Sequence, residues 1–408
     1  MKRAYLLMLL LSACTVAPLG PDGLPVKASP GASGQPLGVP SAGAASVPEA
    51  RPVVKVTGVL GAPCSTLGGS YGNTCFQDGA FKDATFDTAR GLTIGQDGAI
   101  YILDEYNRSL RRASTDGQVT TLAGNNTYYA YDPSNDGTGK AADFRHPQGI
   151  VSDPRGPLWI TEDSKVRRVT LAGEVTTVAG GDATGYADGT GADARFNDLR
   201  GVAIAADGSV VVCDRLNNCL RRITSAGEVT TLAGAPQAGS ADGPGGQARF
   251  YHPTGVALAK DGLLYVTDTG NHLIRRVARD GTVSTFAGSG GVANTATDTA
   301  DIQKNVVDGP AATATFGSPE LIAADPAGNL YVDDLNFTRL GGEQKQAVTR
   351  VIRRVAADGS VVTVLSANDK VLAGVSNFTP GGLMCDGRGN LFITMTDKLE
   401  NAVLQVGF

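Results

Sequence analysis

A long motif set recurs along the chain, and this internal repetition constrains the fold more than any other feature of the sequence. The segment "ADGTGADARFNDLRGVAIAADGSVVVCDRLNNCLRRITSAGEVTTLAG" at 187–234 is followed by a second copy at 241–288 that matches it almost step for step. Phe196 and Phe250 hold the same position in these two copies and lie 54 residues apart. Such register is self-similarity and cannot arise from composition alone.

The same phenylalanine position marks six units along the chain: Phe86, Phe144, Phe196, Phe250, Phe316 and Phe378. Each unit contains short apolar runs rich in Val, Ile and Thr, divided by Asp-Gly and other turn residues. Runs of this kind predict antiparallel strands joined by hairpins. Six four-stranded units over 51–408 predict an all-β chain folded as a six-bladed β-propeller, in which radial repetition protects the sheet edges.

The two ends of this body predict how the ring closes. The sixth unit stops at Phe408 before a fourth strand, whereas "KVTGVLG" at 55–61 resembles a fourth strand that lacks the strands before it. We therefore expect the N-terminal strand to complete the last blade.

The first fifty residues have the pattern of a targeting segment followed by a flexible linker. Lys2 and Arg3 precede an apolar run that is too short to span a bilayer. "LSAC", which ends at Cys14, resembles a bacterial lipobox, and this resemblance implies a signal peptide at 1–13 and lipidation of Cys14. A secretory signal with an incidental cysteine is the alternative. The rest of 14–50 is rich in Pro, Gly, Ala and Ser and predicts a flexible linker.

Charge and targeting together limit the partners. The chain is only 18% charged and has a formal net charge of −5, so it has no electrostatic footprint for nucleic acid or an anionic membrane surface. We expect an extracytoplasmic protein, held at the outer membrane or cell surface by its lipid only, and a monomer.

The motifs "DGxGxxARF", "YVTD", "IRRV" and "VTTLAG", recurring in register, resemble NHL repeats of the bacterial extracytoplasmic kind over 51–408. The resemblance implies a six-bladed propeller of a family that mostly binds proteins, peptides or other ligands and includes a minority of enzymes. Fold transfers across such a family better than function does.

Two sets of repeated charged residues look chemical but fit structural roles better. One acidic position ends the second strand of five units: Asp104, Glu162, Asp214, Asp268 and Asp334. A calcium ring is possible there, but a residue repeated in nearly every blade is expected to cap its own turn. The arginine pairs, from Arg111 and Arg112 to Arg353 and Arg354, are expected to wedge between blades and pair with carboxylates rather than bind RNA.

Function is expected where the units differ, on the face that carries the loops around the channel mouth. The mouth is predicted to be lined by a heterogeneous polar set that suits a ligand: Arg90, Gln148, Arg200, Thr254 and Glu320. A hydrated entrance without a ligand is the alternative. Tyr128, Tyr129 and Tyr131 could stack on a sugar or pack a peptide, and enlarged loops within 289–315 and 335–350 share the same rim.

The cysteines fit an oxidising compartment. Cys213 and Cys219 flank the turn "DRLNN" and are predicted to form a disulfide, and Cys64 and Cys75 bracket a loop and are predicted to form a second one. Cys385 is expected to be a buried, inert thiol.

These features favour a binding or scaffold module at the cell envelope, with a protein, peptide or glycan as its ligand. The alternative is an extracytoplasmic propeller enzyme, a calcium-dependent lactone hydrolase or a lyase. Lyase relatives resemble this fold but use several zinc-binding histidines, whereas the chain has only 3 His. Lactonase-type propellers hold calcium with a set of Glu, Asn and Asp side chains. In this sequence only Glu320 lies near such a position. We assign no catalytic residue and no cofactor, and we leave calcium open.

Overall fold

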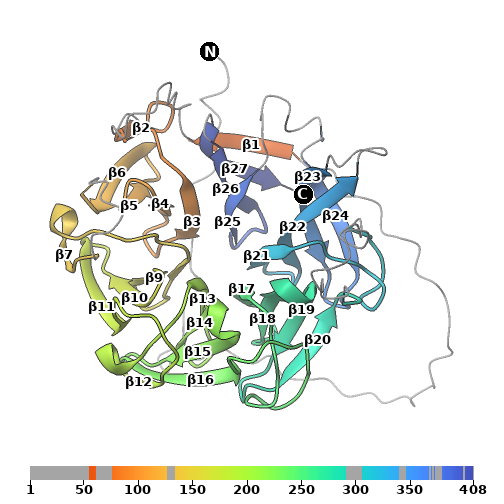
Figure 1. The fold of residues 1–408 in the computed structure, drawn as a ribbon. Helices are drawn as coiled ribbons and strands as arrows, with labels where there is room; N and C mark the ends of the chain where they lie inside the picture. Colours follow the sequence, from red (N-terminus) through yellow and green to blue (C-terminus); the bar gives the residue numbers. More distant parts are fainter. Residues whose placement is uncertain are drawn as a thin grey trace, which may run out of the picture.

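The computed structural model describes residues 55–60, 76–125, 134–290, 306–339, 346–366, 369, 372, 379–397 and 400–407. Six antiparallel sheets surround a common axis and form a six-bladed β-propeller, so the predicted fold is confirmed (Figure 1). None of the helices in these segments is long and apolar enough to cross a membrane. The predicted signal peptide, Cys14, the linker, Cys64, Cys75 and the three rim tyrosines lie outside the described residues.

The first three blades have a common plan: four strands plus a short outer strand from the preceding connection. Blade one consists of β2 (Gly79–Ala80), β3 (Ala89–Ile94), β4 (Ile100–Asp104), β5 (Ser109–Ala113) and β6 (Gln118–Ala123). Blade two consists of β7 (Gly137–Thr138), the 3-10 turn η2 (Gly139–Ala141), β8 (Ile150–Ser152), β9 (Leu158–Thr161), β10 (Lys165–Val169) and β11 (Glu174–Gly180). Blade three consists of β12 (Gly189–Thr190), η3 (Gly191–Asp193), β13 (Leu199–Ile204), β14 (Val210–Asp214), η4 (Arg215–Asn217), β15 (Cys219–Ile223) and β16 (Glu228–Gly234).

The other three blades are four-stranded. Blade four consists of β17 (Pro253–Leu258), β18 (Leu264–Asp268), η5 (Thr269–Asn271), β19 (Leu273–Val277) and β20 (Val283–Ala287). Blade five consists of β21 (Pro319–Ala324), β22 (Leu330–Arg339), β23 (Gln346–Val355) and β24 (Val361–Ser366). Blade six consists of β25 (Pro380–Cys385), β26 (Leu391–Asp397), β27 (Glu400–Gly407) and β1 (Lys55–Leu60). The enlarged segment expected within 335–350 is therefore largely a continuation of the hairpin formed by β22 and β23.

Ring closure occurs as the sequence predicts. The N-terminal strand β1 pairs antiparallel with β27, from Lys55 opposite Gly407 to Leu60 opposite Val403. Figure 1 shows the orange β1 beside the blue β27. Because the last blade combines both ends of the body, the ring is closed by backbone hydrogen bonds.

The hydrophobic core lies between blades rather than within one blade. Six clusters of buried residues each combine side chains from two neighbouring blades. One of them joins Phe392 of blade six to Leu92 and Ile102 of blade one. Because each sheet packs both faces against its neighbours, every residue of β14 is buried.

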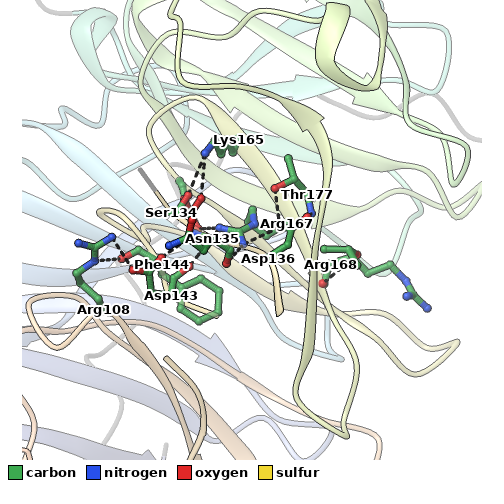
Figure 2. Close-up of polar contacts among 12 residues, drawn as sticks. Arg108, Ser134, Asn135, Asp136, Asp143, Phe144, Lys165, Arg167, Arg168 and Thr177 are labelled. Carbon is green, nitrogen blue, oxygen red and sulfur yellow. Dashed lines mark hydrogen bonds and ion pairs between the residues drawn. The ribbon is translucent and has the colours of Figure 1, made fainter. Parts of the chain in front are cut away.

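In five blades, a completely buried arginine joins two acidic side chains of the same blade. In blade two, Arg167 donates to Glu162 at 2.5 Å. It also donates to Asp136 at 2.9 Å, and its guanidinium lies over the ring of Phe144 (Figure 2). Asp136 in turn accepts hydrogen bonds from the backbone and the hydroxyl of Thr177 on the outer strand. We call this arrangement the arginine clamp.

The clamp recurs with the same partners in the other blades that have the motif. Its arginines, all with 0% exposure, are Arg111, Arg167, Arg221, Arg275 and Arg353. The acids from the Asp-Gly turns that complete it are Asp78, Asp136, Asp188, Asp242 and Asp308. The expected pairing of arginine with carboxylate is confirmed for the first arginine of each pair, and the repeated acids accept hydrogen bonds from these arginines. The described strands of blade six lack the clamp, because Met395 and Leu404 hold the equivalent positions in an apolar cluster.

The expected disulfide between Cys213 and Cys219 is not formed, and both residues are free and buried thiols. Cys213 pairs with Leu220 across the hairpin, and Cys219 pairs with Asp214. This offset of one residue places the two side chains on opposite faces of the sheet. Cys385, expected to be buried, is only partly buried against the core between blades five and six.

Replacing one clamp arginine should destabilise the fold strongly. We expect Arg221→Leu to lower the free energy of unfolding by about 3–5 kcal/mol, because Asp214 is left buried without its cation. Chemical denaturation followed by circular dichroism measures the loss. Arg222→Leu is the matched control, since this neighbouring side chain is partly exposed, and it should cost about 1 kcal/mol or less.

The sixth blade suggests a compensating double variant. Asp214→Met combined with Arg221→Leu copies the pair Met395 and Leu404, so it should lose less stability than Arg221→Leu alone. A double variant less stable than the single one contradicts this interpretation of the clamp.

Candidate functional site

The predicted mouth residues form one ring at the start of the innermost strands. Each is followed by a residue that is glycine in blades one to four, and these glycines allow neighbouring strands to approach closely. A Cβ atom on Gly149 would lie 2.6 Å from the carbonyl oxygen of Arg200, and one on Gly255 would lie 2.5 Å from that of Glu320. These close approaches connect the mouth positions of neighbouring blades in a ring, and Gly382 continues the ring from blade six to Arg90.

In blades one to three the ring residues belong to one polar network. Arg90 Nε donates to Glu105 Oε2 at 2.6 Å, and Gln148 Nε2 donates to Glu105 Oε1 at 3.3 Å. Arg200 then donates to Gln148 Oε1 at 2.7 Å. Asp198 extends the network further, because it pairs with both Arg200 and Arg215. The structure thus joins three of the five predicted residues through side chains of three different blades.

Thr254 and Glu320 lie on the ring but outside that network. The hydroxyl of Thr254 donates to the His252 carbonyl at 3.1 Å and lies 2.8 Å from the hydroxyl of Thr269. Glu320 accepts a hydrogen bond from Arg350 at 3.0 Å, and the same guanidinium donates to the buried Asp333. The ring is therefore chemically divided between blades one to three and blade five.

Sequence reasoning missed the partners of the ring residues: Glu105, Asp198, Arg215, Asp333 and Arg350. A weak signal was present, because Glu105, Arg215 and Asp333 are sequence neighbours of the repeated acids and vary from unit to unit. Only the blade packing shows that these positions face the ring.

His146 and Glu105 form the titratable part of the network. The imidazole Nδ1 lies 3.7 Å from Glu105 Oε1, and the contact with Glu105 and the charge of Asp163 raise the pKa of His146. Burial alone raises the pKa of Glu105, but the contacts of His146 and Arg90 outweigh it and hold the pKa below its usual value. Burial and the charge of Arg215 instead lower the pKa of His252.

Blade two adds a small open pocket beside the ring. Its turn from Glu162 to Arg167 is two residues shorter than the turn from Asp104 to Arg111. The pocket is lined by polar and charged residues: Ser134, Arg145, Glu162, Asp163, Ser164, Lys165, Asp182 and Thr184. Lys165 Nζ lies 2.7 Å from Asp182 Oδ1 and 3.2 Å from Ser134 Oγ, and Figure 2 shows Lys165 pointing toward Ser134.

No group of three or more His, Cys, Asp or Glu side chains suited to a metal ion occurs among the described residues.

The family model of the NHL repeat matches residues 250–276, which contain the first two strands of blade four and most of the third. The protein SUPPRESSOR OF QUENCHING 1, chloroplastic, of Arabidopsis thaliana is 27% identical over 280 residues, covering 51% of this chain and 26% of that protein. Teneurin-4 of Mus musculus is 25% identical over 233 residues, covering 50% of this chain and 8% of the teneurin. The alignments therefore span about half of this chain and a small part of each relative.

Among solved structures, an auxiliary nutrient-binding protein from Bacteroides thetaiotaomicron is similar with a TM-score of 0.53 at 15% identity, covering 87% of this chain and 76% of that one. At this identity the likeness concerns the fold. The comparisons support an NHL-type repeat in blade four and the propeller architecture of the whole body.

The charge of His146 should depend on Glu105. We expect proton NMR to give His146 a pKa above 6.5 and His252 a pKa below it. Glu105→Gln should lower the pKa of His146 and leave that of His252 unchanged, because Glu105 does not act on His252. In the wild type, the attraction between protonated His146 and ionised Glu105 is lost as the pH rises through the raised pKa of His146. Equal His146 values in both proteins would show that Glu105 has no such role.

Proposed function

We propose that this protein is a binding module of the cell envelope, anchored through lipidated Cys14, whose channel mouth holds a polar ligand of peptide or glycan type. The observation that carries the proposal is the network of Arg90, Glu105, Gln148 and Arg200, which is assembled from different blades and has no second copy among the described residues. Residues that maintain the scaffold recur in blade after blade, as the clamp does. A convergent, partly exposed polar group without copies is typical of a ligand site.

The chemistry of the network suits a ligand that offers both donors and acceptors. The Arg90 side chain is 36% exposed, whereas Glu105 is 7% exposed and is held by two donors. Exposed guanidinium groups bind carboxylates and sugar hydroxyls through directional hydrogen bonds. The polar pocket of blade two is lined in part by Arg145, whose neighbour His146 contacts Glu105 of the network. The solved propeller described as an auxiliary nutrient-binding protein is consistent with such a role.

A thermal-shift screen of the full-length protein with short peptides, oligosaccharides and peptidoglycan fragments tests this proposal. Calcium and a chelator form separate arms of the screen. A shift with a peptide or glycan supports binding at the mouth, provided that the variants below remove it. Stabilisation by calcium that a chelator reverses, together with lactone hydrolysis, would favour the enzyme alternative instead.

Arg200→Ala should weaken binding of any ligand found in the screen by about 10–100-fold, since it removes a charged hydrogen-bond donor from Gln148 and Asp198. Isothermal titration calorimetry measures the change. Arg249→Ala is the matched control, because that guanidinium donates to carbonyls of its own loop, and its affinity should equal that of the wild type. Equal affinities of all three proteins would refute a site at the mouth.

Cys14→Ser should release the protein from membranes. The lipobox resemblance implies that the mature chain begins at Cys14 and carries its anchor there. Membrane fractionation should move the variant to the soluble or unprocessed fraction, and mass spectrometry of the wild type should show an acylated N-terminus. If the wild-type chain instead begins at another residue and carries no lipid, the result would support an ordinary secretory signal.

A further inference from the structure

A threonine hydroxyl bridges neighbouring blades at three of the six joints around the channel. These bridges are made by three equivalent residues, Thr161, Thr267 and Thr394. Each lies directly before the acid of the clamp in its blade, or before Met395 in blade six. The hydroxyl of Thr267 donates to the Glu320 carbonyl at 2.7 Å, and that of Thr394 donates to the Arg90 carbonyl at 2.7 Å. Thr161 makes the same contact with the Arg200 carbonyl. Each threonine thus joins its blade to the mouth residue of the next.

Blade five has a carboxyl group at this position. Asp333 is 0% exposed, and Arg350 donates to its Oδ2 atom. Its other oxygen, Oδ1, has no hydrogen-bond partner among the described residues. A carboxylate only accepts hydrogen bonds, so it cannot replace the threonine hydroxyl as a donor to a carbonyl. A buried acceptor without a donor is unfavourable, so this joint favours a ligand group that donates a hydrogen bond.

The same joint differs in its backbone packing. In the other five blades the residue after the mouth position is glycine, and a Cβ atom there would lie 2.5–2.9 Å from the carbonyl of the next blade. Blade five has Leu321 instead, and this side chain is partly exposed. Leucine cannot reproduce the close glycine contact, so the joint between blades five and six is built differently from the others.

The charges at this joint favour a single positive group. Arg350 contacts both Asp333 and Glu320, so the three side chains carry one net negative charge when both acids are ionised. The neighbouring Asp334 is already paired with Arg353. A monovalent cation brings the three groups to neutrality, whereas a divalent ion would leave an excess positive charge beside Arg350. A donor with directional N–H bonds also satisfies Asp333 Oδ1.

We propose that the joint between blades five and six binds a primary ammonium group of the ligand, with Asp333 and Glu320 as its acceptors. This inference rests on the proposed function and defines the ligand class further: a peptide with a free N-terminus or an amino sugar. Both sources present the same donor, and the experiment below separates them.

Protonation of Asp333 should compete with the ammonium group. Burial raises the pKa of Asp333 to about 7, Arg350 opposes this, and the charges of Glu320 and Asp334 add to it. Below that pH the carboxyl group carries its own proton and no longer attracts a cation. Binding should therefore weaken as the pH falls, by roughly eightfold between pH 7.5 and 6.0 for a carboxyl pKa near 7.

Calorimetry of the full-length protein with two probe pairs tests the inference. Trialanine is compared with N-acetyl-trialanine, and glucosamine with N-acetylglucosamine, at pH 7.5 and 6.0. We expect the free amine of one pair to bind at least about tenfold more tightly than its acetylated form at pH 7.5. The pair that shows this difference identifies the source of the ammonium group.

Two variants and a control keep the result interpretable. Asp333→Thr restores the residue of blades two, four and six, and Asp333→Asn keeps the shape without the charge; both should abolish the preference for the free amine. Asp358→Asn removes an exposed acid of the same blade, and the preference should remain. Retention of the preference in both Asp333 variants overturns the inference.

Failure of this inference is distinguishable from failure of the proposed function. Equal binding of free and acetylated probes that Arg200→Ala weakens overturns the ammonium site and leaves ligand binding at the mouth intact. If none of the four probes binds, the ammonium site is also overturned, whereas the proposed function falls only if the wider ligand screen finds nothing.

Discussion

In five blades a guanidinium with no access to solvent lies between two carboxylates and over a phenylalanine ring, and the rest of the propeller depends on this contact. One carboxylate ends the second strand, and the other comes from the Asp-Gly turn that also binds the outer strand, as Asp136 binds Thr177. The clamp therefore ties the inner, outer and connecting segments of a blade at one point. It explains why three distant sequence motifs recur together, because each supplies one part of the same buried ion network.

The sixth blade shows that the clamp is one of two solutions. There Met395 and Leu404 fill the same positions, and the blade is held instead by the pairing of β1 with β27. A blade that brings the two ends of the body together gains the backbone hydrogen bonds between β1 and β27. Because scaffold stability is carried by the clamps, the core between blades and this closure, residues at the channel mouth are free to differ from blade to blade.

The ring positions of the candidate site could be predicted from the sequence, but the contacts between them could not. Arg90, Gln148 and Arg200 were recognisable because a repeat places equivalent positions on a common ring. Their partners Glu105 and Asp198 lie in other segments, and only blade packing brings them within hydrogen-bond distance. The wrong disulfide has a related cause, since proximity in a hairpin does not specify register, and an offset of one residue turned Cys213 and Cys219 to opposite faces.

The sequence by itself determined the number of blades, the closing strand and the positions around the channel, because these follow from a repeat whose period and punctuation are local properties. Tertiary structure alone decided which charges meet. In the sequence, Asp333 is one more acid beside Asp334. In the folded protein, Asp334 belongs to the clamp of its own blade, whereas Asp333 lies at the joint with the next blade. Alternation along a strand gives neighbouring residues opposite surroundings, and what those surroundings contain is set by segments far away in the chain.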